Sequence, residues 1–260
     1  MKSPLILYLK KIKIFFLYFY QEHLISSKRK IKFKNDFKIL YKKIKKKQNF
    51  AFSRFSDGEL FVIQNKKLII ANNYWLVDDK KTYAKFHKND QKKFLPSKHK
   101  FYRKKLIDSL TFEKKNYFKG VSCLCCNGRN SVNYMKSFVK SKKNLTFSNL
   151  LQNNNYPLFI KKMIKIFSKK KIILVANKNH NHLKLPFLIE KKFNIGKNCL
   201  INDFNIIRKI KKFIIKNNIK NHIFLISASS LSNILIKELF KEFDKNTYID
   251  IGSTLNPYYN

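Results

Sequence analysis

Acidic residues are scarce in this sequence: 15 Asp and Glu stand against 57 Lys and Arg in 260 residues, so the formal net charge is +42. Glycine and proline are also rare, with 5 of each, which excludes collagen-like and proline-rich low-complexity chains. The 4 cysteines are too few and too clustered to staple a domain of this size, so we expect a reducing, cytoplasmic compartment. The sequence contains no nucleophile elbow, Walker loop or G-x-G-x-x-G motif.

Hydrophobic residues make up 44% of the chain and include 25 Phe and 13 Tyr, which excludes a disordered chain despite the charge. The positive charge attracts anions, so nucleic acid, anionic lipid and nucleotide phosphates are all candidate ligands. The basic residues are spread over the whole chain, however, and no zinc finger, RNP motif or basic region leading into heptads occurs. We therefore expect no specific nucleic-acid partner, and a basic α/β nucleic-acid-binding protein without catalysis stays as the alternative.

The segment Pro4–Tyr20 is apolar apart from Lys10, Lys11 and Lys13. Three central lysines disfavour a membrane-spanning helix, and the charge order and missing cleavage site disfavour a signal peptide. Two alternatives remain open: a helix peripheral to an anionic membrane at its cytoplasmic side, or a segment that packs on the domain's own core or is poorly anchored. With the Lys-rich connector Ser26–Gln48, this segment forms a predicted helical extension over residues 1–49.

From residue 50 onward, short apolar runs alternate with stretches of helical spacing, apart from Asn72–Lys98, which shows no clear periodicity. This alternation predicts one α/β domain over residues 50–260, Rossmann-like, with a mostly parallel sheet and helices on both faces. The predicted strands are Phe50–Arg54, Tyr117–Cys125, Ile172–Ala176, Asn198–Ile201, Ile223–Ile226 and Tyr248–Ile251. The predicted helices begin near Gly58, cover His99–Leu110, Val132–Val139, Tyr156–Phe167, Leu183–Lys192 and Ser229–Phe243, and include one capped by Asp203 that runs to Lys216.

A polar constellation follows the first strand of the predicted domain: Arg54, Ser56, Asp57, Gly58 and Glu59. Ligands of open α/β sheets bind beyond the carboxyl ends of strands, where these residues lie. Paired carboxylates suit Mg²⁺ or Mn²⁺, glycine lets a ligand approach the backbone, and an arginine binds phosphate. The competing interpretation is a capping box, in which Ser56 and Glu59 satisfy the N–H groups of a helix end and Asp57 favours the helix dipole.

Other polar residues follow later strands of the predicted sheet. Asn177, His180 and His182 come after Ile172–Ala176 and could contact a donor phosphate or act as a base, and a plain polar turn is the alternative. Ser227–Ser230 could bind phosphate or ribose, or simply cap a helix. Asp250 ends the last strand and could point into the same pocket. Cys123 and Cys126 form a C-x-x-C, but free cysteines on an apolar strand usually behave as buried hydrophobes.

Several segments together resemble one family. FSRFSDGEL, residues 52–60, resembles the R-x-G-D-G-E segment of bacterial glycosyltransferases with the GT-D fold, a domain long catalogued as of unknown function. KKIILVANKN and KNCLINDFNIIRKI match the family's central strand and following unit in order and spacing. NHIFLISASSLSNILIKELF and NTYIDIGSTLNPYY resemble its last two strands. The resemblance covers roughly residues 50–258, with Ser56 in place of the usual glycine and a different tail after Gly252.

The resemblance implies a metal-assisted glycosyltransferase that moves a sugar from a nucleotide-sugar donor to a glycan or glycoprotein acceptor. Carried over, Asp57 and Glu59 would hold a divalent cation, Mn²⁺ or Mg²⁺, on the donor diphosphate. We expect Arg54 to act with them and to hold the phosphates. The other residues expected at the donor are Gly58, Asn177, Ser229, Ser230 and Asp250. A catalytically degenerate transferase fold is a further alternative.

Overall fold

The computed structural model describes residues 33–71, 73–83, 91–152 and 155–259, together with Leu9, Ile12 and Phe16. The segment Pro4–Tyr20 therefore lies outside the described residues apart from these three positions, and its two alternatives stay open. Within the described ranges, no helix combines the length and the apolar character that crossing a membrane requires. Of the predicted connector, the part from Phe33 to Lys45 forms helix α2.

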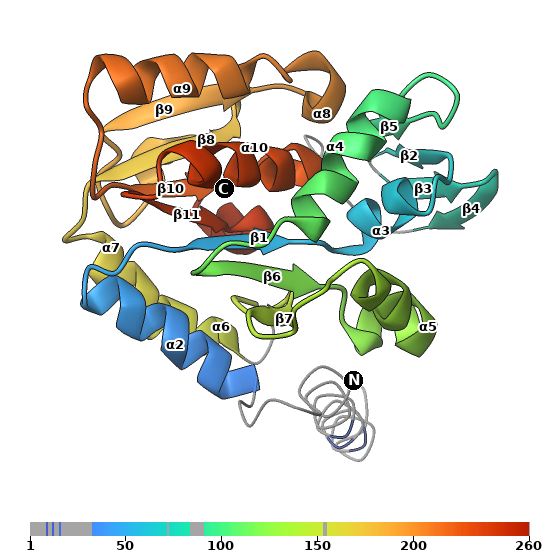
Figure 1. The fold of residues 1–260 in the computed structure, drawn as a ribbon, viewed down its shortest axis with the longest axis horizontal. Coiled ribbons are helices and arrows are strands. Elements are labelled where there is room, and N and C mark those ends of the chain that lie inside the picture. Colours follow the sequence, from blue (N-terminus) through green and yellow to red (C-terminus); the bar gives the residue numbers. More distant parts are fainter. Residues whose placement is uncertain are drawn as a thin grey trace.

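A seven-stranded parallel sheet forms the centre of the fold, in the order β7-β6-β1-β11-β10-β8-β9 (Figure 1). Every pair of neighbours in it is parallel. The strands are β1 (Ala51–Arg54), β6 (Tyr117–Val121), β7 (Leu145–Phe147), β8 (Ile172–Asn177), β9 (Lys191–Ile195), β10 (Ile223–Ile226) and β11 (Thr247–Asp250). The strands β1, β8, β10 and β11 are buried along their whole length, and β8 and β10 accordingly read as apolar runs. The predicted α/β class is confirmed.

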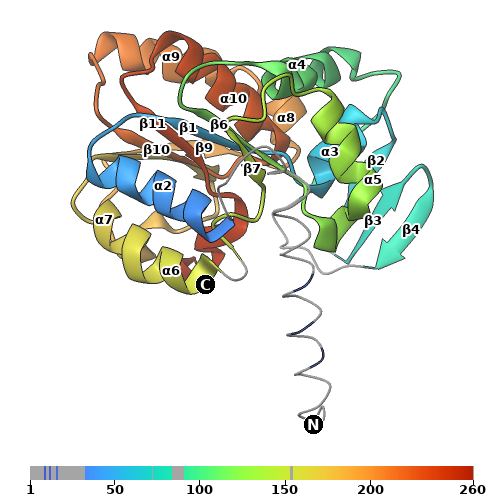
Figure 2. The same ribbon diagram turned by 60° about the horizontal axis from the view of Figure 1, so that its bottom comes forward.

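Helices cover both faces of this sheet, as predicted. On one face lie α4 (Lys100–Thr111), α9 (Ile206–Lys216) and α10 (Ser229–Glu242), and on the other lies α2 beside the helical segment 156–167 (Figures 1 and 2). That segment is α6 (Tyr156–Leu158), the π-helical Phe159–Ile164 and α7 (Lys165–Phe167). The other helices are α5 (Leu124–Ser137), the shorter α3 (Asp57–Ile63) and α8 (Cys199–Asn202), and the 3₁₀ helices His182–Lys184 and Gly252–Tyr258.

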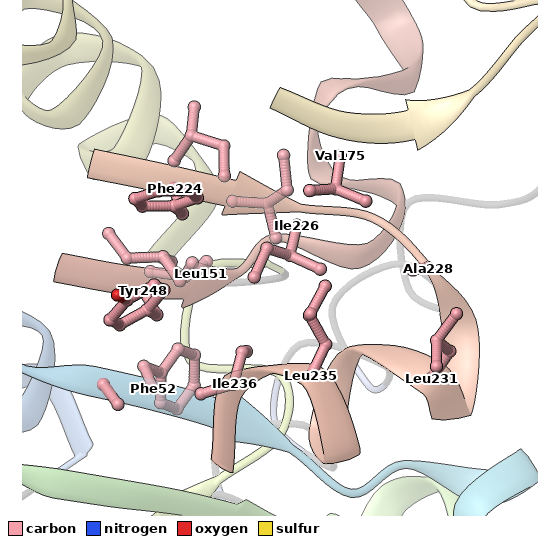
Figure 3. Packing of buried hydrophobic residues seen from close by; sticks show 14 of the residues in the cluster. Phe52, Leu151, Val175, Phe224, Ile226, Ala228, Leu231, Leu235, Ile236 and Tyr248 are labelled. Carbon is pink, nitrogen blue, oxygen red and sulfur yellow. The ribbon is translucent and has the colours of Figure 1, made fainter. Parts of the chain in front are cut away.

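The hydrophobic core fills the space between the sheet and its helices. Phe52, Phe224 and Tyr248 from the strands and Leu231 and Leu235 from α10 are completely shielded from solvent (Figure 3). The rings of Phe224 and Tyr248 stack with their centroids 4.9 Å apart. Because α2 also contributes Phe37, Leu40 and Ile44 to this cluster, the core extends past the predicted boundary at residues 49 and 50.

A second sheet, antiparallel and four-stranded, is formed within residues 68–94, most of which lie in the region without clear periodicity. Its order is β4-β3-β2-β5, with β2 (Leu68–Ile70), β3 (Tyr74–Val77), β4 (Lys80–Tyr83) and β5 (Lys92–Phe94). The hairpin β3–β4 turns through Asp78 and Asp79, both at positive φ, as a tight two-residue turn requires. The sequence pattern does not indicate this sheet, because its strands are only three or four residues long. In addition, β3 is half-buried on both faces, so its residues show no alternation of buried and exposed positions.

Four predicted elements differ from the structure. The stretch Leu183–Lys192 is not a helix: Pro186 interrupts the helical pattern, and Lys191–Ile195 instead pairs with β8 as an edge strand. Asn198–Ile201 is not a strand, because Asn198 has a φ of 50° and the short helix α8 follows it. Asp203 does not cap α9, which begins at Ile206; its carboxylate accepts the Gly196 N–H at 2.8 Å. The strand predicted over Tyr117–Cys125 ends at Val121.

Candidate active site

A cavity of about 300 Å³ lies beyond the carboxyl ends of the central strands. Its walls come from the ends of β1, β8, β10 and β11, from the small sheet and from the segment after β9. Of the residues predicted for the site, Arg54, Asp57, Gly58, Glu59, Asn177, Ser229 and Asp250 all line it. Ser230 lies directly behind the wall, where its hydroxyl donates to Glu59. The structure thus brings together residues spread over almost 200 positions of the chain.

Arg54 is the last residue of β1, and its guanidinium is held from several sides. Its Nε donates to the carbonyl of Ser148 at 2.5 Å, and its Nη2 donates to Oε1 of Gln152 at 3.1 Å. A Cβ on Gly252, which has a φ of 47°, would collide with the guanidinium, so only glycine leaves room for this side chain. Its Nη1 is buried and has no hydrogen-bond acceptor within the described ranges. Arg54 lines the cavity, and Nη1 is the part of its guanidinium that these contacts leave without an acceptor.

Asp250 ends β11 next to Arg54. Its Oδ1 accepts the N–H of Gly252 at 3.0 Å, and its Oδ2 accepts the backbone N–H of Arg54 at 3.4 Å. Burial raises the pKa of this carboxyl to about 7, although the charge of Arg54 acts in the opposite direction. The side chain therefore ties the ends of two adjacent strands together and carries a proton part of the time at neutral pH.

This shifted pKa predicts a pH dependence of stability. Folded Asp250 has a pKa of about 7, above the unfolded value of 3.8, so between these values the folded protein holds one more proton than the unfolded chain. The free energy of unfolding should then fall by about 1.4 kcal/mol per pH unit from this group as the pH rises between those two values. Urea unfolding of the wild type and of Asp250→Asn over this range isolates the effect, because the asparagine does not titrate. Parallel curves for the two proteins would contradict the assignment.

Asp57 is the first residue of α3 and is half-buried at the cavity. Its Oδ1 accepts a hydrogen bond from Nδ2 of Asn127 at 2.7 Å. Burial raises the pKa of Asp57, and the neighbouring charge of Glu59 adds to that effect, while the bond from Asn127 opposes it. Asn127 comes from α5, next to Gly128, whose φ of 69° interrupts the helix. Its role was not predicted, because one asparagine among many in this chain carries no signal.

Glu59 uses its two oxygens for different partners. Its Oε2 accepts the backbone N–H of Ser56 at 3.0 Å, as in a capping box. Its Oε1 faces the other way, accepts the hydroxyl of Ser230 at 2.6 Å and forms an ion pair with Nζ of Lys92 at 3.2 Å. Burial alone would raise the pKa of Glu59, but the charge of Lys92 and these hydrogen bonds outweigh it and lower the pKa. Glu59 is therefore a buried carboxylate with a cation already beside it.

The D-x-E pair fits a divalent cation only in part. Both oxygens of Glu59 already have donors, and the nearest cation is the ammonium of Lys92. Asp57 has one oxygen engaged by Asn127. Among the residues that the structure describes, no three His, Cys, Asp or Glu side chains gather into a group able to hold a metal. Glu59 therefore does not fit a divalent cation in this arrangement, because Lys92 and two hydrogen-bond donors already occupy its oxygens.

The remaining predicted residues behave more like structural elements. Asn177 accepts the N–H of Asn179 at 3.0 Å through its Oδ1, as a polar turn does, while still lining the cavity. The ring of His180 is buried and stacks on Tyr259 with 4.2 Å between the centroids. His182 begins a 3₁₀ turn away from the cavity lining. Cys199, which was not predicted for the site, also lines the cavity; its thiol donates to the carbonyl of Ala228, and burial raises its pKa to about 12, so it stays protonated.

The sequence matches no protein-family model and no curated protein. A selenomethionine structure of domain of unknown function 1792 (DUF1792) is 14% identical, with 90% of this chain and 82% of the other covered and a TM-score of 0.52. A second structure of that domain, described as having a distinct glycosyltransferase fold, is 13% identical over 82% of this chain and 76% of the other, with a TM-score of 0.51.

A third similar structure is described as a new glycosyltransferase (DUF1792) from Streptococcus sanguinis. It is 12% identical over 84% of this chain and 80% of the other, with a TM-score of 0.55. At these identities the likeness concerns the fold, and it agrees with the GT-D resemblance found in the sequence. This chain has the distinct glycosyltransferase fold described for DUF1792.

Proposed function

We propose that this protein is a glycosyltransferase that moves a sugar from a nucleotide-sugar donor to a glycan or glycoprotein acceptor. The observation that carries the proposal is the buried Nη1 of Arg54, which lacks an acceptor within the described ranges at a cavity beyond the carboxyl ends of parallel strands. A guanidinium in this position is suited to a phosphate oxygen. The fold shared with structures described as glycosyltransferases supports the same interpretation.

In the proposed reaction, the bond between the anomeric carbon and the donor phosphate breaks, and its electron pair leaves with the nucleoside diphosphate. Arg54 would bind the charge that develops there, and it is pre-positioned by Ser148 and Gln152. The N-terminus of α10, at Ser229 in the cavity wall, favours the same anion. Gly58 in the first turn of α3 and Asn177 at the end of β8 also line the cavity.

Assistance by Mn²⁺ or Mg²⁺ at Asp57 and Glu59, which the resemblance implies, is not carried into the proposal, because both oxygens of Glu59 already have donors. One further prediction from the sequence remains part of the proposal. Association of Pro4–Tyr20 with an anionic membrane at the cytoplasmic side concerns a segment outside the described residues. Vesicle sedimentation of the full chain tests that association without reference to catalysis.

A thermal-shift screen of nucleotide sugars tests the function. A ligand at 100 times its Kd stabilises the folded state by about 2.7 kcal/mol, which such a screen detects readily. Because the net charge of +42 attracts any anion, each sample is compared with sodium sulfate at equal ionic strength. We expect one nucleotide sugar to raise the melting temperature above the sulfate control and to be turned over when acceptor glycans are added. Equal shifts with all anions and no turnover would contradict the proposal.

A further inference from the structure

Lys92 is a buried lysine that sequence analysis passed over. It is the first residue of β5, and its side chain is 6% exposed. The next residue, Lys93, points to the opposite side of the strand and is exposed, whereas Phe94 is again buried. A lysine is rarely buried without a partner, because taking an ammonium out of water is unfavourable. The small sheet therefore places the ammonium of Lys92, and not that of Lys93, at the wall of the cavity.

The ammonium of Lys92 is fixed between the first turns of two helices. It lies 3.2 Å from Oε1 of Glu59 on α3 and donates to Oγ of Ser230 on α10 at 2.7 Å. A Cβ on Gly58 would lie 2.7 Å from Nζ, so the glycine gives this cation room beside the backbone of α3. An ammonium has three N–H donors, and these contacts use two of them. The third has no acceptor among the described residues, and Lys92 lines the cavity.

A divalent cation at the same carboxylate would meet this ammonium. Mg²⁺ binds carboxylate oxygens at about 2.0–2.1 Å, and Lys92 already approaches Oε1 of Glu59 to 3.2 Å. Two cations on one buried oxygen repel each other in a medium of low dielectric constant. The other oxygen of Glu59 is occupied by the backbone N–H of Ser56. Glu59 is thus neutralised by the chain itself.

We infer that Lys92 takes the position at Glu59 that the resemblance gives to a divalent cation, and that its ammonium binds the diphosphate of the donor. This inference rests on the proposed function for the identity of the diphosphate. Glu59 and Ser230 are then positioning residues that aim Lys92, rather than metal ligands. Lys92 keeps its proton throughout: the anomeric carbon–oxygen bond breaks toward the phosphate, the acceptor oxygen bonds to the carbon, and the acceptor's proton leaves to solvent.

Calorimetric binding of inorganic pyrophosphate in EDTA tests the inference directly, because pyrophosphate represents the diphosphate of any nucleotide sugar. The test variant is Lys92→Met, and the matched control is Lys93→Met, which removes the same charge one residue away on the exposed side of β5. We expect Lys92→Met to weaken binding about tenfold or more, as losing a hydrogen bond to a charged group does, with Lys93→Met near the wild type. Equal affinities of the two variants would overturn the inference.

Lys92→Met leaves Glu59 buried and unpaired, so the variant could fail to fold. The double variant Lys92→Met/Glu59→Gln removes both charges and keeps an acceptor for the Ser56 N–H, and it should show the same loss of pyrophosphate binding. Titration with Mn²⁺ alone provides a second readout. A tight Mn²⁺ site in the wild type that disappears in Glu59→Gln would overturn the inference.

The outcomes separate this inference from the proposed function. If pyrophosphate binding in EDTA depends on Lys92 but no nucleotide sugar is bound or turned over, the cation site stands and the transferase proposal fails. If a nucleotide sugar is turned over only with Mn²⁺, and Glu59→Gln abolishes Mn²⁺ binding, the transferase proposal stands and the inference about Lys92 fails.

Discussion

Replacing Arg54 by methionine is expected to lower the rate of sugar transfer by about 100-fold or more, because it removes a preorganised cation from the developing negative charge. The guanidinium is already held at Ser148 and Gln152, so its orientation does not have to be created when the donor binds. Arg54→Lys should recover little of this activity, since an ammonium cannot span both acceptors and also reach a phosphate with a planar fork. Turnover of the donor found in the nucleotide-sugar screen gives the measurement.

The lower rate of sugar transfer in Arg54→Met should not result from unfolding, because Asp250 can take up a proton when the arginine is absent. Without Arg54 the carboxyl loses the charge that opposes the burial effect, so its pKa should rise further above about 7. At pH 6 the residue then takes up a proton instead of remaining as an unpaired buried charge. Arg54→Met should therefore be clearly less destabilised at pH 6 than at pH 8, relative to the wild type.

Arg103→Met is the matched control for Arg54→Met. Arg103 is also partly buried, and its Nε donates to a backbone carbonyl, that of Ile63, at 3.0 Å. It lies outside the cavity lining, so this variant should retain transfer activity. A similar loss of activity in both variants would mean that the effect is general to the charge or stability of the protein, and Arg54 would lose its place in the site.

The site residues at the carboxyl ends of the parallel strands could be predicted from the sequence. β1, β8, β10 and β11 were predicted as strands, and the polar residues at their carboxyl ends meet because all four strands run parallel. This reasoning needs no knowledge of side-chain contacts. It placed Arg54, Asp57, Asn177 and Asp250 in one cavity.

The residues that hold these side chains in place could not be predicted from the order of strands. Lys92 stands beside Lys93 in a chain with 57 Lys and Arg, and nothing in that dipeptide indicates which ammonium is buried. The difference arises from the pairing of β5 with β2, which turns one side chain toward Glu59 and the other toward solvent. Gln152 and Asn127 likewise reach Arg54 and Asp57 only through the tertiary fold. The choice between capping box and binding site at Glu59 also needed the structure, because one oxygen makes the capping contact and the other pairs with Lys92.

The second large effect concerns the stability contributed by the pair of Glu59 and Lys92. Removing one member of a buried ion pair leaves the other charge unpaired and costs about 3–5 kcal/mol, whereas replacing both members costs much less. The side chains of Lys92 and Glu59 are 6% and 7% exposed, so this rule applies to them. We expect Glu59→Gln and Lys92→Met each to lower the free energy of unfolding by that amount, and the double variant to lose clearly less than the sum.

Urea unfolding measures this double-mutant cycle. Two comparisons show whether the measured loss is specific to the ion pair. The amide oxygen introduced by Glu59→Gln can still accept the Ser56 N–H, so this variant retains the helix cap and reports mainly on the missing charge. The exposed pair of Lys67 and Asp79 has a shorter separation of 2.6 Å, but its side chains are 37% and 74% exposed. Breaking it with Asp79→Asn should cost less than about 1 kcal/mol, because solvent screens that interaction. Additive losses at Glu59 and Lys92 would mean that the two charges do not stabilise each other, and the ammonium would then have no fixed position from which to bind a diphosphate.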